Sequence, residues 1–178
     1  KTEVFGSITS RGVVLAPLDR KQVFDTLKKH HGRGSRTVAI CLKNSYANPL
    51  HEKQVAEIAA EVGFVNIHLS YHLSQAPGYL DRAETVVLNA YLSETVKSYF
   101  MAIEQCLAKQ SSFHVMTSEG SLKLRDEIEP RDLILSGPAG GAAALMLLDA
   151  KGANLPSRWI GFDMGGTSTD VCRADGEI

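Results

Sequence analysis

A strand–helix–strand pattern in the first half of the chain constrains the fold most. Residues 37–42 form a continuous apolar run, which is typical of a strand covered on both faces. A helix should follow, with Asn48 as its cap, Pro49 at its first position and Gly63 at its end. Residues 65–70 alternate between apolar and polar side chains and predict a second strand. The short connections indicate a right-handed βαβ unit, so we predict an α/β fold with an at least partly parallel sheet.

Further elements flank this unit. Residues 4–15 predict a hairpin, and Asp19 is a suitable N-cap for a helix after it. Residues 79–109 predict a long helix. We expect that helix to bury one apolar face, formed by Leu88, Tyr91, Leu92, Val96, Tyr99, Phe100, Ile103 and Leu107.

Three short segments follow the long helix. Residues 113–116 predict a strand. Residues 122–132 are charged and aperiodic, which indicates an exposed connection. Residues 133–135 indicate a short apolar strand or a buried approach to the next element.

A glycine-rich motif at residues 163–170 follows an apolar run at residues 160–162. Gly165 and Gly166 predict a two-residue hairpin turn, because glycine adopts positive φ without steric cost. Their N–H groups are also free to face an anion, as in a phosphate nest. Hydroxyl donors would be added to that nest by Thr167, Ser168 and Thr169.

One carboxylate stands on each side of this motif. Asp163 and Asp170 are unsuited to contact phosphate themselves, because like charges repel. They are suited to hold Mg²⁺ through waters, since that ion prefers a few carboxylates together with substrate phosphate. The residues alone leave open a second reading, an ordinary Gly-Gly hairpin with a polar tip.

A second glycine-rich segment, Ser136-Gly137-Pro138-Ala139-Gly140-Gly141, is predicted to open a helix over residues 142–150. Unpaired N–H groups at the positive end of a helix dipole form an anion site. Small residues equally allow two backbones to approach closely. Both readings stay open here.

Composition excludes several classes of protein. The 178 residues suit one domain, or one and a piece of another. With 44% hydrophobic and 22% charged residues, the chain is neither disordered nor membranous. A net charge of −1 gives no electrostatic footprint for nucleic acid or an anionic membrane. Three widely spaced cysteines favour reduced thiols in the cytoplasm, and residue 1 is Lys rather than Met, as in a piece of something longer.

Four segments together resemble the hydantoinase A/5-oxoprolinase family, including its N-methylhydantoinase A-like members. The family is similar in fold to actin, the sugar kinases and the seventy-kilodalton heat-shock chaperones. The motif at Asp163–Val171 is similar to the family's second glycine-rich motif. The other matching segments, in the same order as in the family, are Ser45–Glu52, Val87–Leu92 and Leu135–Gly141.

The resemblance implies a ribonuclease H-like, actin-like ATPase lobe with a mixed, partly parallel sheet, followed by the start of a second lobe. It places residues 1–135 in the N-terminal domain of the family, which is the first lobe. Residues 136–178 would begin the second lobe and carry its glycine-rich phosphate hairpin.

The resemblance also implies an activity, in which ATP hydrolysis is coupled to opening a cyclic amide such as a hydantoin or 5-oxoproline. ATP would phosphorylate the carbonyl oxygen, and Asp163 or Asp170 would orient Mg²⁺ or polarise water. The implied partners are nucleotide, a small cyclic amide and a second hydantoinase subunit, with no nucleic acid or membrane. The implied phosphate-binding residues are Ser136, Gly137, Gly140, Gly141, Gly165, Gly166, Thr167, Ser168 and Thr169.

Two alternatives follow from the same resemblance. The family includes ATP-using subunits of ketone carboxylases. A domain of this fold could also be a non-catalytic module retained for binding a partner protein.

The chain departs from the family pattern in two places. Family members usually carry Asn-Gly-Gly where this chain has Glu119-Gly120-Ser121. Nothing in residues 1–36 resembles the first glycine-rich hairpin, which grips the phosphates from the opposite side. We therefore expect these 178 residues to hold at most half of a nucleotide site and to be inactive by themselves.

Overall fold

Short two-stranded sheets and helices make up the chain in a computed structural model, which describes residues 1–108, 110–150 and 158–175. The chain divides into two units, Lys1–Val96 and Lys97–Ile178. The predicted lobe boundary between residues 135 and 136 stays a prediction.

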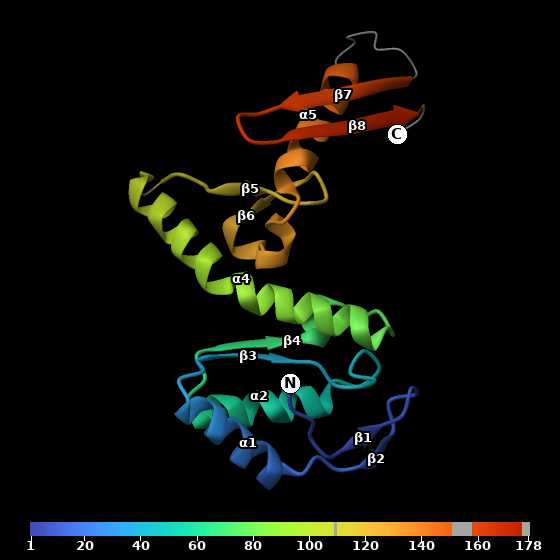
Figure 1. Ribbon diagram of the computed structural model, residues 1–178, viewed down its shortest axis with the longest axis vertical. Coiled ribbons are helices and arrows are strands. Elements are labelled where there is room, and N and C mark those ends of the chain that lie inside the picture. Colours follow the sequence, from blue (N-terminus) through green and yellow to red (C-terminus); the bar gives the residue numbers. More distant parts are fainter. Residues whose placement is uncertain (109, 151–157, 176–178) are drawn as a thin grey trace. The chain divides into compact units, whose positions relative to one another are not determined.

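The first unit contains the predicted βαβ arrangement (Figure 1). Strands β3 and β4 pair in parallel, from Thr37 opposite Asn66 to Ile40 opposite Leu69. The α/β class and the parallel pairing are therefore confirmed. The elements of this unit are β1 (Ser7–Ile8), β2 (Val14–Ala16), α1 (Arg20–Gly32), β3 (Thr37–Ile40), α2 (Leu50–Val62), β4 (Asn66–Leu69), α3 (Ser70–Leu73) and the first part of α4 (Tyr79–Cys106).

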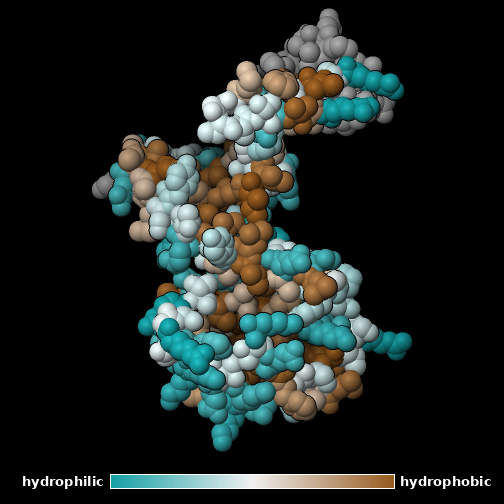
Figure 2. All heavy atoms as spheres, viewed as in Figure 1, coloured by the Kyte–Doolittle hydropathy of each residue, from teal (hydrophilic) through white to brown (hydrophobic). Residues whose placement is uncertain are grey.

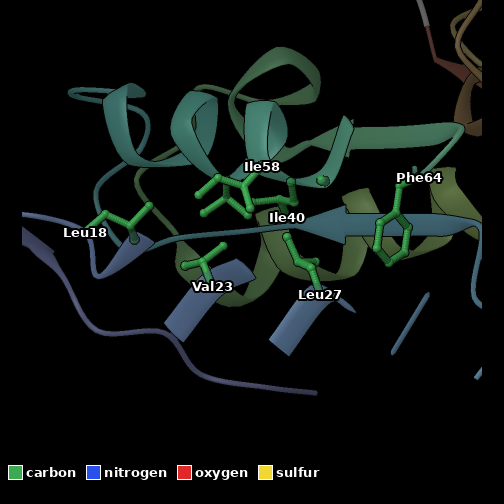
Figure 3. Close-up of a cluster of buried hydrophobic side chains, with 8 residues drawn as sticks. Leu18, Val23, Leu27, Ile40, Ile58 and Phe64 are labelled. Carbon is green, nitrogen blue, oxygen red and sulfur yellow. The ribbon is translucent and has the colours of Figure 1, made fainter. Parts of the chain in front are cut away.

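The apolar core of the first unit lies where α1 and α2 pack beside β3. Figure 3 shows side chains from both helices and from the strand converging on one another. Ile58 is almost fully buried, which contributes about 2 kcal/mol by removing its side chain from water. The buried cluster comprises Leu18, Val23, Leu27, Ile40, Val55, Ile58, Ala59 and Phe64.

The helix ends are close to the predicted ones. Asp19 caps α1, because its Oδ1 accepts a hydrogen bond from Gln22 N at 3.0 Å. Helix α2 begins one residue later than predicted, with Pro49 at the cap and Asn48 Oδ1 accepting from Leu50 N at 3.0 Å. Asn48 also donates from Nδ2 to the carbonyl of Gly12 in the first hairpin, at 2.8 Å. The side chain of Asn48 thus joins the start of α2 to that hairpin.

Glu52 is fully buried beside the carboxyl ends of β3 and β4. Its Oε1 accepts from Leu42 N at 2.8 Å and from Ser70 Oγ at 2.6 Å. Its Oε2 accepts from Tyr71 N at 3.2 Å. A buried carboxylate needs such partners, because an unpaired charge away from water is strongly unfavourable.

Arg82, at the start of α4, is fully buried in the same region. It donates from Nη2 to Leu42 O at 2.9 Å, from Nη1 to Ala76 O at 2.8 Å, and from Nε to Ser70 Oγ at 3.4 Å. Ser70 therefore bridges Glu52 and Arg82. This Glu52–Ser70–Arg82 network ties together the loops that follow both parallel strands.

His51, at the start of α2, is buried, and its ring packs near the backbone of Gly6. Burial lowers the pKa of His51 below its ordinary value of 6.5. The folded chain therefore favours the neutral ring, and the unfolded chain binds more protons once the pH falls below 6.5.

We expect the free energy of unfolding to fall as the pH is lowered through 6.5 and to level off below the pKa of His51 in the folded chain. Urea denaturation between pH 7.5 and 5.0 measures this change, compared with His51→Gln. The Gln variant should show a smaller loss over the same pH window. An identical pH profile in both proteins would contradict the assignment to His51.

The predicted apolar face of α4 is half right, because Phe100 is buried and Leu92, Val96 and Ile103 are half-buried, whereas the other four residues are exposed. In the first unit Leu88 is 42% and Tyr91 80% exposed, whereas Arg82, Val86 and Asn89 are fully buried. These three residues share a helix face because their spacings are four and three. A search for apolar periodicity misses this face, because Arg82 and Asn89 are polar. Their burial is tolerated only because they form hydrogen bonds, such as the one from Arg82 to Leu42 O. In the second unit Phe100 is buried as predicted, edge-on to Phe113 at 5.4 Å between ring centroids.

The second unit consists of two antiparallel hairpins and a helix between them in sequence (Figure 1). Residues 122–132 are not a structureless connection, because Leu122–Leu124 pairs with β5. Residues 133–135 are neither a strand nor a buried approach, because Leu133 ends a short 3-10 helix and Ile134 and Leu135 are exposed turn residues. The elements are the end of α4, β5 (His114–Met116), β6 (Leu122–Leu124), η1 (Arg125–Glu127), η2 (Pro130–Leu133), α5 (Ser136–Ala150), β7 (Arg158–Met164) and β8 (Thr169–Asp175).

The cysteines and helices bear on two expectations from the sequence, that the thiols are reduced and that the chain does not cross a membrane. Cys41, Cys106 and Cys172 are free thiols. Burial raises the pKa of the Cys41 thiol, so it stays protonated at neutral pH. Within the described parts of the chain, no helix is both long and apolar enough to cross a bilayer.

Candidate functional site

The glycine-rich motif forms the tip of the β7–β8 hairpin. Met164 pairs with Thr169, so the loop between the strands has four residues, Gly165 to Ser168, rather than the predicted two-residue turn. Neither glycine takes the left-handed conformation that the prediction assumed. The loop is closed instead by a hydrogen bond from Gly165 N to Ser168 O at 2.9 Å. A four-residue loop reverses the chain without the positive φ angles that a two-residue turn demands.

The loop differs in detail from the expected phosphate nest. Gly165 N–H is engaged by Ser168 O, so this amide is not free to meet an anion in the observed conformation. Gly166 has open space around it. Among the described residues, no hydrogen bond occupies the exposed side chains of Thr167, Ser168 and Thr169. These hydroxyls are accessible to an incoming ligand.

Asp163 and Asp170 stand directly opposite each other on the two strands. Side chains of directly opposed residues lie on the same sheet face with Cβ atoms about 5 Å apart, and like charges there are destabilising. Within residues 1–108, 110–150 and 158–175, no Lys or Arg forms an ion pair with either carboxylate, and neither belongs to a cluster of three metal-ligating side chains. The pair can therefore offer two carboxylates to a cation that takes its other ligands from elsewhere.

The hairpin has one covered and one exposed face. Gly161, on the same face as Asp163, is buried against Leu145 of α5. The opposite face is exposed and carries four apolar residues besides Arg158, Thr169 and Arg173, and Figure 2 shows brown side chains on the surface of this part of the second unit. Its exposed apolar residues are Ile160, Phe162, Met164 and Val171. The two carboxylates thus lie on the face that α5 supports.

Gly161 is a supporting residue that the sequence reasoning missed. An alanine Cβ there would overlap Leu145 Cδ1 and lie 2.6 Å from Cys172 Sγ. The available signal was a glycine inside an apolar strand, which often marks a close approach of a neighbouring element.

We expect Gly161→Ala to lower the free energy of unfolding by about 1–3 kcal/mol, because Leu145 and Cys172 must both move to admit the methyl group. Chemical denaturation of the 178-residue chain measures the effect. Gly166→Ala is the matched control, since a Cβ there meets no atom within 4 Å. Equal stability of the two variants would show that the packing at Gly161 is looser than described.

The segment Ser136–Gly141 lies inside α5 rather than before it, so the predicted helix start at residue 142 is wrong by six residues. The reason is that Pro138 fits the first turn of a helix and small residues do not interrupt it. A Cβ at Gly140 would lie 3.3 Å from Met116 Cγ, and one at Gly141 would lie 3.5 Å from Asp163 Oδ2. A Cβ at Gly137 would meet nothing within 4 Å. Of the two predicted glycine-rich segments, Gly141 and Asp163 are the residues that come together.

The departure from the family pattern at Glu119 lies in the turn between β5 and β6. Its carboxylate is 3.5 Å from Lys123 Nζ, with a side chain 77% exposed. Gly120 in the same turn has φ +75° and lies close to Ala139 and Ala143 of α5. Glu119 is thus a surface residue of a turn that rests on α5.

Comparison with protein families gives two matches. A model described as hydantoinase/oxoprolinase matches residues 82–178. A model of the hydantoinase/oxoprolinase N-terminal region matches residues 1–63. Together the two models account for most of the chain.

Relatives of known name are enzymes and an enzyme subunit. The chain is 38% identical over 169 residues to 5-oxoprolinase of Saccharomyces cerevisiae, covering 93% of this chain and 13% of that protein. It is 31% identical over 177 residues to the acetophenone carboxylase gamma subunit of Aromatoleum aromaticum, covering 92% of this chain and 23% of the relative. The chain thus spans a small part of the relatives it matches.

Solved structures share the fold. An ATP-dependent caprolactamase from Pseudomonas jessenii matches with a TM-score of 0.79 and 27% identity, covering 96% of this chain and 25% of that one. A nucleotide-free acetone carboxylase matches with a TM-score of 0.80 and 24% identity, covering 97% of this chain and 25% of that one. The arrangement of elements described above therefore recurs within larger ATP-dependent enzymes.

Proposed function

Because the chain belongs to the hydantoinase/oxoprolinase family, we propose that it forms part of the ATP site of a hydrolase that opens a cyclic amide, such as a hydantoin or 5-oxoproline. Support comes from the likeness to 5-oxoprolinase and to an ATP-dependent caprolactamase, both named for cyclic-amide substrates. The family match over residues 82–178 includes the hairpin that carries both carboxylates.

The observation that carries the proposal is the opposed pair Asp163 and Asp170 beside a loop rich in free hydroxyls. Phosphoryl transfer requires mainly positioning of the phosphates and neutralisation of their charge. Two facing carboxylates without a cationic partner among the described residues fit Mg²⁺, which takes one or two carboxylates and keeps several waters. Bound there, the ion would neutralise charge on the phosphates of ATP.

The remaining residues of the motif would act on the nucleotide directly. Thr167, Ser168 and Thr169 would donate hydroxyl hydrogen bonds to phosphate oxygens, and Gly166 would let the backbone approach them. Gly165 would contribute its N–H after its bond to Ser168 O opens. Gly140 and Gly141 lie beyond the first turn of α5, beside Met116 and Asp163, and are better suited to packing than to cradling phosphate. Ser136 and Gly137 lie in the first turn of α5, and their role as phosphate-binding residues stays a prediction.

The chemistry that follows would make a stable ring amide open to attack by water. Transfer of the γ-phosphoryl group to the carbonyl oxygen breaks the terminal phosphoanhydride bond and forms an imidate-type phosphate. Water would then attack the activated carbon, and the ring C–N bond would break to give an amine and an acyl phosphate. A second water would hydrolyse that acyl phosphate to the carboxylate and inorganic phosphate. The ring-binding residues would come from outside the motifs described here.

A carboxylase subunit is the second candidate, because the acetophenone carboxylase gamma subunit is 31% identical to this chain. The nucleotide half of the site would be the same in both cases. The acceptor of the phosphoryl group would differ, and with it the compound that stimulates ATP hydrolysis. A partner subunit would then be expected as well, since the relative is itself named a subunit.

An ATPase assay on a full-length family member that contains this segment tests the proposal. We expect Mg²⁺-dependent ADP release to be stimulated by 5-oxoproline or a hydantoin. Stimulation only by a ketone together with bicarbonate would instead support the carboxylase candidate. The isolated 178 residues serve as the control, and we expect no ATP turnover from them.

A further inference from the structure

Two adjacent glycines, Gly140 and Gly141, lie within helix α5. Glycine is the least favourable residue inside a helix after proline, because it loses the most backbone freedom. Glycines at such positions indicate a local requirement that alanine does not meet. The surroundings of the two residues show that the requirement differs between them.

Packing explains Gly140. A Cβ there would lie 3.3 Å from Met116 Cγ, which is tighter than an ordinary carbon–carbon contact. Packing does not explain Gly141 in the same way. A Cβ there would lie 3.5 Å from Asp163 Oδ2, an ordinary contact distance that leaves room for alanine. The methyl group of that alanine would, however, cover one oxygen of the carboxylate.

We propose that Gly141 is a positioning residue that keeps Asp163 Oδ2 open to a hydrated divalent cation. This inference rests on the proposed function, which makes Asp163 and Asp170 the cation-binding pair. Mg²⁺ dehydrates reluctantly and binds with several of its waters in place. A methyl group against Oδ2 would take the volume that those waters need and would remove water from the carboxylate itself. Gly141 thus lowers the stability of helix α5 but leaves Asp163 Oδ2 accessible to the hydrated cation.

If Gly141 has this role, Gly141→Ala should raise the stability of the chain and weaken its binding of divalent cations. A purely structural glycine would not give these two opposite effects. Gly141→Ala should raise the unfolding temperature of the 178-residue chain by about 2–4 °C, since alanine favours the helix. The same variant should weaken divalent-cation binding about tenfold, as changes beside metal ligands commonly do.

Manganese titration followed by NMR tests this with a readout independent of enzyme activity. Mn²⁺ at substoichiometric concentrations should broaden the amide signals around Asp163 and Asp170 in the wild-type chain. Broadening of those signals should require about tenfold more Mn²⁺ in Gly141→Ala. Gly137→Ala is the matched control, because it replaces another glycine of α5 whose Cβ would meet nothing within 4 Å, and it should leave the titration unchanged.

The outcomes separate this inference from the function on which it rests. Equal broadening in the wild type and in Gly141→Ala would overturn the role of Gly141 and leave the carboxylate pair standing as the metal site. No broadening near Asp163 and Asp170 in the wild type would overturn the metal site, and the role of Gly141 with it. Asp163→Asn should abolish the broadening, which confirms that it reports on this carboxylate.

Discussion

Replacing Asp163 with Asn should lower the kcat of a full-length family member carrying this motif by about 100-fold or more. The amide keeps the shape of the side chain but removes the negative charge that would bind Mg²⁺ next to the phosphates. KM for ATP should change less than kcat, because the charge is needed most where charge develops in the transition state. Steady-state ATP hydrolysis with the cyclic amide present measures both constants.

The same substitution should not destabilise the fold. Asp163 and Asp170 are directly opposed like charges, so removing one should leave the unfolding free energy unchanged or raise it by up to about 1 kcal/mol. In a full-length protein that contains this 178-residue segment, Glu119→Gln is the matched control for activity, because Glu119 is an exposed carboxylate of the same unit that pairs with Lys123. Near-normal turnover in Asp163→Asn together with normal stability would mean that Asp163 is only a strand residue beside the turn.

The parts of the fold with strong local signals were predictable from the sequence. The βαβ unit was predictable, because an apolar run, a capped helix and an alternating strand each specify their own conformation. A short crossover between two parallel strands also has one favoured hand. The hairpin that carries Asp163 and Asp170 was predictable, but the register that places these two residues opposite each other was not. A hairpin was expected, but with a two-residue turn at Gly165 and Gly166, whereas the loop has four residues closed by Gly165 N and Ser168 O.

Other features depend on tertiary contacts that no local pattern encodes. Helix α4 buries Arg82 and Asn89 because hydrogen bonds make polar burial acceptable, and apolar periodicity cannot register that. Residues 122–124 (Leu-Lys-Leu) form β6 because a partner strand is available at β5, although the stretch 122–132 as a whole is charged and aperiodic. The contact of Gly141 with Asp163 joins residues far apart in sequence, and it was not foreseen that one glycine-rich segment would support the other.

The largest effect on stability is expected at Glu52. Removing its carboxylate leaves the amides of Leu42 and Tyr71 and the hydroxyl of Ser70 without their acceptor in a buried place. It also leaves the buried guanidinium of Arg82 without the negative charge that Ser70 links to it. Breaking a buried charge network by removing one member costs about 3–5 kcal/mol, a large share of the 5–15 kcal/mol that holds a typical domain together.

Urea denaturation of the 178-residue chain tests this with Glu52→Ala, Arg82→Met and the double variant. Each single variant should lose about 3–5 kcal/mol, and the double variant clearly less than the sum, because the second substitution removes a charge already left without its counterpart. Glu57→Ala is the control, since Glu57 is exposed and lies 3.8 Å from Arg20, a surface pair that contributes about 0–1 kcal/mol. Strict additivity would show that Glu52 and Arg82 stabilise their loops separately. A loss at Glu52 no larger than at Glu57 would show that the network does not hold the ends of β3 and β4 together.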